Sequence, residues 1–140
     1  MKTIIMMLAA ILVTGYTMAG EPKGHKLTVV IKNFENTDGQ AMVSYFQSED
    51  KFLKDGKGAR TTINDKNEIK VVFENVQPGT LAVSVVHDEN GNNELDKGVF
   101  GIPTEDYGFS NDAKGSFGPP SFEQCQFELN SDKTIEININ

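Results

Sequence analysis

Apolar and polar residues alternate along several short segments of the chain. Leu81, Val83 and Val85 form one such series, and a second runs through residues 133–139. A period of two residues places successive side chains on opposite faces of an extended strand, which is typical of antiparallel sheets with one buried face. The segments that predict strands are 26–34, 40–47, 68–74, 80–87, 122–129 and 133–139, with a weaker seventh at 59–63.

No segment after residue 19 carries a long apolar stripe with the helical period of 3.6 residues, so a helical core is disfavoured. The pattern predicts an all-β fold: a single antiparallel β-sandwich of about seven strands, immunoglobulin-like or transthyretin-like. Pro78 and Gly79 between two strong strands form a turn signal. The stretch from Phe73 to Thr80 resembles a recurring hairpin of transthyretin-like sandwiches.

The first 19 residues predict a cleavable secretory signal peptide. Lys2 precedes the apolar run 4–13, and the small residues Thr17 and Ala19 stand before Gly20. A retained anchor is disfavoured because a membrane span needs about 20 apolar residues. We therefore expect a periplasmic or secreted protein of residues 20–140, folded as one β-sandwich domain with no membrane span after signal cleavage.

The charge balance excludes one class of partner, and the single cysteine excludes an internal disulfide. The chain has 13 Lys and Arg residues against 20 Asp and Glu residues, a net charge of -7. Such a surface repels phosphate backbones, so nucleic acid is excluded as a partner. Cys125 has no partner for an internal disulfide, and the predicted strand around it indicates a small buried side chain rather than a reactive thiolate.

The loop 88–121 is unusually long for a compact domain, which indicates either a functional loop or an element that the pattern does not reveal. Its glycines and prolines argue against a helix. It also carries Phe100, Tyr107, Phe109 and Phe117. These rings either pin the loop onto the sandwich or line a ligand surface.

The start of this loop has the ligand spacing of a calcium loop. Asp88, Asn90, Asn92 and Asp96 occupy positions 1, 3, 5 and 9, and Glu94 offers its backbone carbonyl at position 7. Oxygen ligands at this spacing favour calcium, and we expect weak affinity, with a Kd on the order of 10⁻⁴ to 10⁻³ M. The predicted metal ligands are therefore Asp88, Asn90, Asn92, Glu94 and Asp96.

The loop also departs from an EF-hand. Asn93 stands where glycine belongs, and Val99 stands where the bidentate glutamate belongs. A missing carboxylate would have to come from Glu94, Glu105, Asp106 or Asp112. The equally weighted alternative is a plain Asn/Asp/Gly turn whose side chains cap their own backbone and bind no metal.

The residues offer little support for catalysis. The chain has two histidines, and His25 lies near the mature N-terminus, which leaves His87 as the only plausible catalytic imidazole. A three-ligand zinc centre is therefore hard to assemble. Glu105 and Asp106 are adjacent acids of the kind that glycosidases pair, although such acids in loops are usually solvated. We predict no catalytic residues.

An ordered set of motifs resembles the bacterial exported family named domain of unknown function 2141. The set comprises Pro78-Gly79-Thr80, His87-Asp88-x-Asn90-x-Asn92-x-x-Leu95-Asp96, Glu105-x-Tyr107-Gly108-Phe109-Ser110-Asn111 and Gly118-Pro119-Pro120-Ser121-Phe122. The resemblance runs from about residue 26 onward. It implies an exported β-domain of unassigned role, and it supplies no catalytic residues.

Three functions remain open at this point. The first is a noncatalytic binding module with a calcium-ordered loop, acting on an envelope protein or glycan. The second is a cell-envelope hydrolase that uses carboxylates of the loop. The third is a structural stabiliser without a small ligand. The hydrolase requires carboxylates that converge in space.

Overall fold

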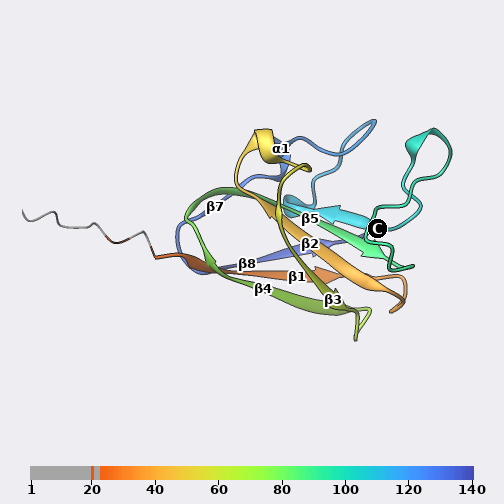
Figure 1. Ribbon diagram of the computed structural model, residues 1–140, viewed down its shortest axis with the longest axis horizontal. Helices are drawn as coiled ribbons and strands as arrows, with labels where there is room; N and C mark the ends of the chain where they lie inside the picture. Colours follow the sequence, from red (N-terminus) through yellow and green to blue (C-terminus); the bar gives the residue numbers. More distant parts are fainter. Residues whose placement is uncertain (1–19, 21–22) are drawn as a thin grey trace, which may run out of the picture.

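The chain folds into two β-sheets packed face to face, as the computed structural model in Figure 1 shows. The structure describes residue 20 and residues 23–140, so the predicted signal peptide lies outside the described residues. The strands are β1 (His25–Lys32), β2 (Gln40–Phe46), β3 (Lys57–Thr62), β4 (Glu68–Val76), β5 (Gly79–Asp88), β6 (Tyr107–Phe109), β7 (Phe127–Leu129) and β8 (Lys133–Asn138). Among these residues no helix is long and apolar enough to cross a membrane.

The first sheet has three strands in the order β4-β1-β8. β1 and β4 are antiparallel, whereas β1 and β8 are parallel, with Leu27 opposite Lys133 and Ile31 opposite Ile137. The prediction of a purely antiparallel sandwich is therefore wrong for this pair. β8 reaches β1 only after the chain has passed through the other sheet, so no tight turn imposes the antiparallel direction.

The second sheet follows the order β3-β2-β5-β6, and β7 pairs with the first residues of β5. The resemblance of 73–80 to a hairpin is wrong in this chain, because β4 pairs with β1 while β5 pairs with β2. The turn at Pro78 and Gly79 instead carries the chain from one sheet to the other. Gly79 has a φ of 139°, which a residue with a Cβ rarely adopts.

The core lies between the two sheets and draws on the inward face of each. Leu27, Ile31 and Ile137 of the first sheet and Val43 and Val85 of the second are fully buried. Each such side chain contributes about 1.5–3 kcal/mol by leaving water. The alternating residues in the sequence are thus the ones that hold the sheets together.

The segment predicted as one strand over 122–129 is divided. Its first half is the helical turn α1 (Phe122–Cys125), and only its second half is β7. Ser121 begins α1 with a capping box, in which its Oγ accepts the Gln124 N–H at 3.2 Å and the Gln124 Oε1 accepts the Ser121 N–H at 2.9 Å. The Ser-x-x-Gln spacing was the sequence signal for this helix start.

Cys125 ends α1 and does not lie in a strand. Its side chain is fully buried in a second apolar cluster with Phe46, Phe109 and Phe122. Burial raises the pKa of the Cys125 thiol to about 11. The predicted buried, unreactive cysteine is confirmed in its burial.

The long loop conceals short elements: β6 and the 3₁₀ turns η2 (Val99–Gly101) and η3 (Ser110–Asp112). Phe109 is buried and Tyr107 packs beside it, with ring centroids 5.9 Å apart. Phe100 and Phe117 are 96% and 106% exposed. The prediction that these aromatic rings pin the loop onto the sandwich is therefore confirmed for Tyr107 and Phe109. It is wrong for Phe100 and Phe117.

Candidate functional site: an Asp/Asn loop and an open cleft

Asp88 is the last residue of β5, and its side chain is fully buried at the start of the long loop. Its Oδ1 accepts the Asn92 N–H at 3.1 Å, and its Oδ2 accepts the Asn93 N–H at 2.9 Å and the Gln40 Nε2–H at 2.7 Å. One carboxylate thus fixes the course of the loop and joins it to the neighbouring strand β2.

The Asp88 carboxylate is buried and remains ionised. Burial by itself would raise its pKa, but the hydrogen bonds from Gln40, Asn93 and Asn92 stabilise the charged form. The net result is a pKa below the ordinary value of 3.8.

The other side chains of the predicted calcium loop bind the loop itself. The Oδ1 atoms of Asn90 and Asn92 accept the N–H groups of Asn92 and Glu94, each at 3.0 Å. The Asn92 Nδ2 donates to the Asp96 Oδ1 at 2.7 Å, and the Asn90 amide also donates to Asp96. The structure therefore brings Asn90, Asn92 and Asp96 together, while the Glu94 side chain is exposed.

Glu105 closes the loop from the other end. It is only 8% exposed, and its two oxygens accept the Glu89 N–H at 3.0 Å and the Asp96 N–H at 3.1 Å. One of the acids considered for catalysis or for a missing ligand thus has a structural role.

Asn93 takes the left-handed conformation, with a φ of 66°, where an EF-hand has glycine.

These contacts describe the capped turn that was the alternative to the calcium site. Within residues 20 and 23–140, no group of three or more His, Cys, Asp or Glu residues is placed to hold a metal ion. The Asp88 Oδ2 already accepts two N–H groups. Among the described residues, the Oδ1 atoms of Asn90 and Asn92 each accept only one, which leaves each a second lone pair. The metal site at Asp88, Asn90, Asn92, Glu94 and Asp96 stays a prediction.

His87 lies on the opposite face of β5 from Asp88. It is fully buried, its ring stands edge-on to Phe34 at 5.3 Å, and its Nε2 is 2.8 Å from the Asp38 carbonyl oxygen. Its Nδ1 has no hydrogen-bond partner among the described residues and lies 3.9 Å from the Glu89 Oε1. Substrate in solvent has no access to this imidazole in the folded chain.

An open cleft of about 630 Å³ lies where the end of β1, η3 and the C-terminus meet. Its lining residues are Asn33, Glu35, Asp106, Asp112, Lys114, Asn138, Ile139 and Asn140. A hollow of about 130 Å³ shares Asp112, Lys114, Asn138 and Asn140 with it and adds Tyr107. The motif of residues 105–111 contributes Asp106 to the cleft and Tyr107, Gly108 and Phe109 to the hollow.

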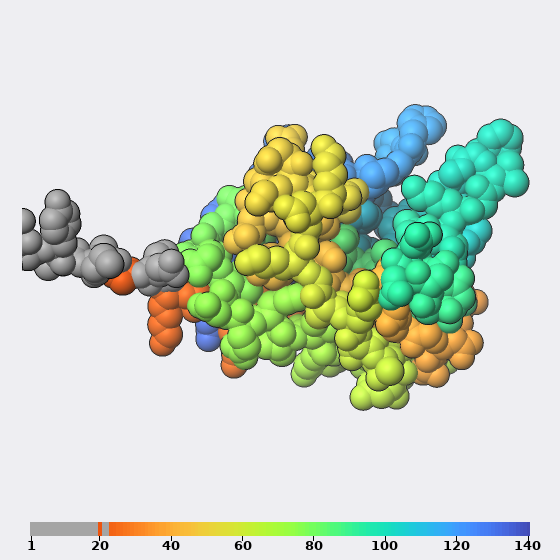
Figure 2. Space-filling view, viewed as in Figure 1, coloured from red at the N-terminus to blue at the C-terminus, as the bar shows by residue number. Residues whose placement is uncertain are grey.

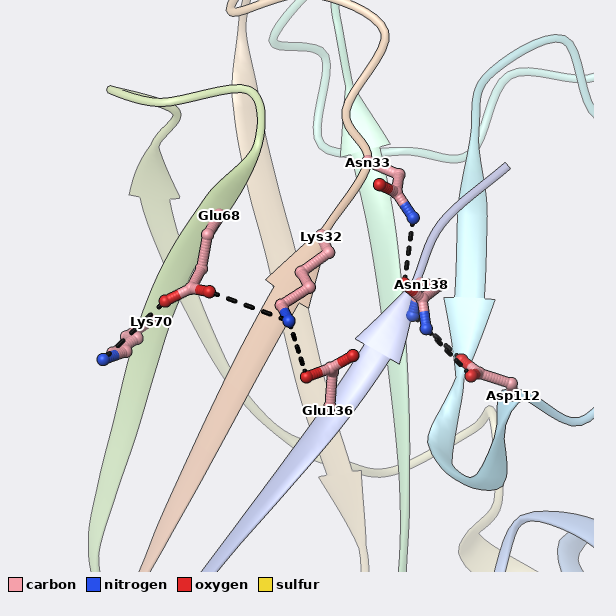
Figure 3. Close-up of polar contacts among 7 residues, drawn as sticks. All are labelled: Lys32, Asn33, Glu68, Lys70, Asp112, Glu136 and Asn138. Carbon is pink, nitrogen blue, oxygen red and sulfur yellow. Dashed lines mark hydrogen bonds and ion pairs between the residues drawn. The ribbon is translucent and has the colours of Figure 1, made fainter.

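Hydrogen bonds among the lining residues fix part of this cleft, as Figure 3 shows. The Asp112 carboxylate accepts the Asn138 N–H and the Asn138 Nδ2–H, both at 2.9 Å. The Asn33 Nδ2 donates to the Asn138 Oδ1 at 2.9 Å. These bonds tie β1 and β8 to η3. The sequence could not reveal them, because the three residues come from distant segments.

A line of opposite charges crosses the outer face of the first sheet beside the cleft (Figure 3). The Lys32 Nζ lies 2.8 Å from the Glu136 Oε2 and 3.9 Å from the Glu68 Oε2, and Lys70 lies 3.7 Å from Glu68. The bond to Glu136 raises the pKa of the half-buried Lys32. Exposed pairs of this kind contribute little stability, so we assign this line no binding role.

Comparison with known proteins yields a family and no individual relative. A family model described as "Uncharacterized protein conserved in bacteria (DUF2141)" matches residues 29–138. No curated protein and no solved structure matches the chain. The matched range contains the Asp/Asn loop and all the cleft residues except Ile139 and Asn140.

Proposed function

The chain belongs to the bacterial family DUF2141, whose members are described as uncharacterized, and from this premise we propose that it is a noncatalytic binding module for an envelope glycan. The cleft of about 630 Å³ carries the proposal, because amide and carboxylate side chains dominate its lining. We propose a periplasmic or secreted location, which the charged and apolar pattern of the first 19 residues supports.

The chemistry of the lining suits a polyhydroxyl ligand. Each sugar hydroxyl both donates and accepts a hydrogen bond, and the Asn140 amide offers both kinds of group. The Asn33 Oδ1 adds an acceptor, since only the Nδ2 of that amide is bonded to Asn138. Glu35 and Asp106 add acceptors, and Lys114 adds a donor. Tyr107 in the adjoining hollow adds an aromatic side chain. A few polar groups of fixed orientation are what a small-molecule site requires.

The features beside the cleft favour binding over hydrolysis. The Asp112 carboxylate accepts two hydrogen bonds from Asn138, and the Glu105 carboxylate accepts two backbone N–H groups. The His87 imidazole is buried. One observation keeps the hydrolase as a second candidate: Glu35 and Asp106 both line the cleft. Two carboxyl groups across a bound sugar are the minimum that most glycosidases use.

Calorimetric titration with chitotetraose and with soluble peptidoglycan fragments tests the proposal. We expect saturable binding, weakened at least tenfold by Asp106→Ala, because a hydrogen bond to a charged group contributes about 1.5–3 kcal/mol. Asp55→Ala removes an exposed carboxylate far from the cleft lining and should bind like the parent. Absence of saturable binding to either probe, or equal weakening by Asp55→Ala, refutes the glycan site. New reducing ends after incubation would instead identify the hydrolase.

Two finer proposals accompany this one. We propose that the sandwich is immunoglobulin-like or transthyretin-like; the two-sheet arrangement and the cross-over turn at Gly79 support it. We also propose that calcium orders the loop 88–96. The spacing of Asp88, Asn90 and Asn92 supports calcium, and the bonds of Asn90 and Asn92 to Asp96 bring three of the predicted ligands together.

A further inference from the structure

Two loops rise from the body of the molecule and end in exposed apolar side chains. The first tip, residues 97–104, carries Val99, Phe100 and Ile102, which are 75%, 96% and 64% exposed. The second tip, residues 113–121, carries Phe117 at 106%. Figures 1 and 2 show both tips projecting to the same side beyond the sheets. These four residues are the majority of the large exposed apolar side chains among the described residues; the others are Leu53 and Val72.

The first tip is held in shape by its own backbone. Lys97 and Pro103 form an isolated β-bridge, and the Gly98 N–H donates to the Ile102 carbonyl oxygen at 2.8 Å. Below it, the Thr104 N–H donates to the Asp96 carbonyl oxygen at 2.9 Å. Phe100 has a φ of 61°, a conformation that bulky residues rarely adopt. These contacts therefore fix the backbone from which the apolar side chains project.

The two tips differ in charge from the rest of the chain. Each tip contains one lysine, Lys97 or Lys114, and neither contains an acid, although the whole chain has a net charge of -7. Acidic residues stand next to each tip in the sequence. Asp96 and Glu105 flank the first tip, and Asp112 precedes the second tip. Phenylalanine with flanking lysine is the composition that partitions into a membrane interface, where the lysine reaches back to water.

Shape and area favour lipid over a protein partner. A stable protein interface buries about 800 Å² on each side in matched surfaces. Four side chains on two separate convex tips offer no groove and little continuous area. A bilayer needs no complementary shape, so each inserted side chain contributes independently.

We propose that the two tips insert together into the surface of a lipid bilayer and dock the protein there without spanning it. The carboxylates at the base of the loops stop the insertion at the level of the headgroups. Because the body is acidic and each tip has only one lysine, insertion is driven by the apolar side chains rather than by attraction to anionic lipid. The proposal shares Asp112 and Lys114 with the glycan cleft, but the four apolar side chains that carry it do not line that cleft.

Flotation with phosphatidylcholine vesicles at 150 mM salt tests the proposal. The chain from Gly20 is used, because the run 4–13 would itself bind lipid and all residues of both core clusters lie between Leu27 and Ile139. We expect the parent to float and the double variant Phe100→Ser, Phe117→Ser to lose at least tenfold in vesicle binding. Val72→Ser removes an exposed apolar side chain from β4 and should float like the parent. Thermal melting verifies that each variant is folded.

A local probe reports the insertion itself. The chain has no tryptophan, so Phe100→Trp introduces a single reporter, and Val72→Trp is its matched control. We expect the emission of the tip reporter to shift to the blue with vesicles and to be quenched by spin labels near the headgroup. The control should do neither.

Several results would overturn the proposal. They are absence of flotation, equal flotation of the double variant, and a tip reporter that stays open to aqueous iodide when vesicles are present. Binding that requires phosphatidylglycerol and disappears in high salt would show adsorption by charge and would also overturn it. A dimer of the parent that the double variant loses, without vesicle binding, would assign the tips to self-association instead.

Discussion

At the level of single residues, two buried carboxylates organise the long loop. Asp88 fixes its first turn through Asn92, Asn93 and Gln40, and Glu105 joins its two ends. A buried acceptor that loses its donors, or a donor that loses its acceptor, costs about 1–3 kcal/mol. Both acids thus contribute to folding independently of any ligand.

Asp88 should make the stability of the protein depend on acid pH. Its pKa is depressed in the folded state, so its contribution is present above the unfolded pKa near 3.8 and is lost as the pH falls through the lower folded value. We expect Asp88→Asn to be less stable than the parent at neutral pH by about 1–3 kcal/mol and to lose less on acidification below pH 4. Melting from pH 2.5 to 7 measures both.

Glu94→Gln is the matched control for this prediction, because the Glu94 side chain is exposed in the same loop. Its melting profile should follow that of the parent over the whole range. If Asp88→Asn instead loses stability in acid as steeply as the parent, other carboxylates dominate the acid limb and the assignment to Asp88 is wrong.

At the level of elements, β6 is a short strand that contains a glycine for steric reasons. A Cβ on Gly108 would lie 2.8 Å from the Ile137 Cγ2 and 3.0 Å from the Asn138 carbonyl oxygen. β6 thus lies directly against the end of β8, which brings the two sheets together beside the cleft. Glycine at this place in the Tyr-Gly-Phe segment permits that approach.

Gly108→Ala should therefore destabilise the protein by about 1–3 kcal/mol through overpacking. It should also disturb the cleft, because Asn138 is part of the lining. Gly58→Ala on the edge strand β3 is the control, since its nearest neighbour is the Ser44 Oγ at 3.1 Å, the end of a small side chain. Denaturant unfolding of both variants measures the difference; equal stability would mean that β6 can move away from β8 without cost.

At the level of the whole molecule, calcium binding would appear as a gain in global stability. A cation that binds only the folded state stabilises it by RT ln(1 + [L]/Kd), so 10 mM calcium on a millimolar site contributes about 1.4 kcal/mol. We expect a rise in the melting temperature of roughly 4–8 °C and a much smaller rise with magnesium, which demands octahedral geometry. A rise equal for both cations would reflect screening of the acidic surface and contradict the site.

Export is also a property of the whole chain. If residues 1–19 are a signal peptide, the exported product begins at Gly20, because Thr17 and Ala19 fit the peptidase positions before the cut. Intact mass spectrometry of the protein released from the producing cell measures this. A product that retains Lys2 and the apolar run would contradict the prediction.

The sequence by itself determined the β-rich class, six of the seven predicted strands, the two-layer core and the burial of Cys125. These follow from the alternation of apolar residues, which is local and needs no knowledge of partners. The length of the loop 88–121 also predicted either a functional loop or an element that the pattern does not reveal. The sequence misassigned 122–125, because the alternation of Cys125, Phe127 and Leu129 was extended back to Phe122. Phe122 and Cys125 lie three residues apart, which is the spacing of the capped helical turn.

Only the tertiary structure decided which strands pair and what surrounds each polar side chain. The parallel pairing of β1 with β8, the cross-over between β4 and β5, and the three-residue strand β6 depend on contacts between distant segments. The cleft joins Asn33, Asp112 and Asn138, which are far apart in the chain. Burial turned Asp88 and Glu105 into acceptors for backbone N–H groups, whereas exposure left Phe100 and Phe117 at the tips. The physical reason is that desolvation and packing act between surfaces that meet only when the sheets assemble.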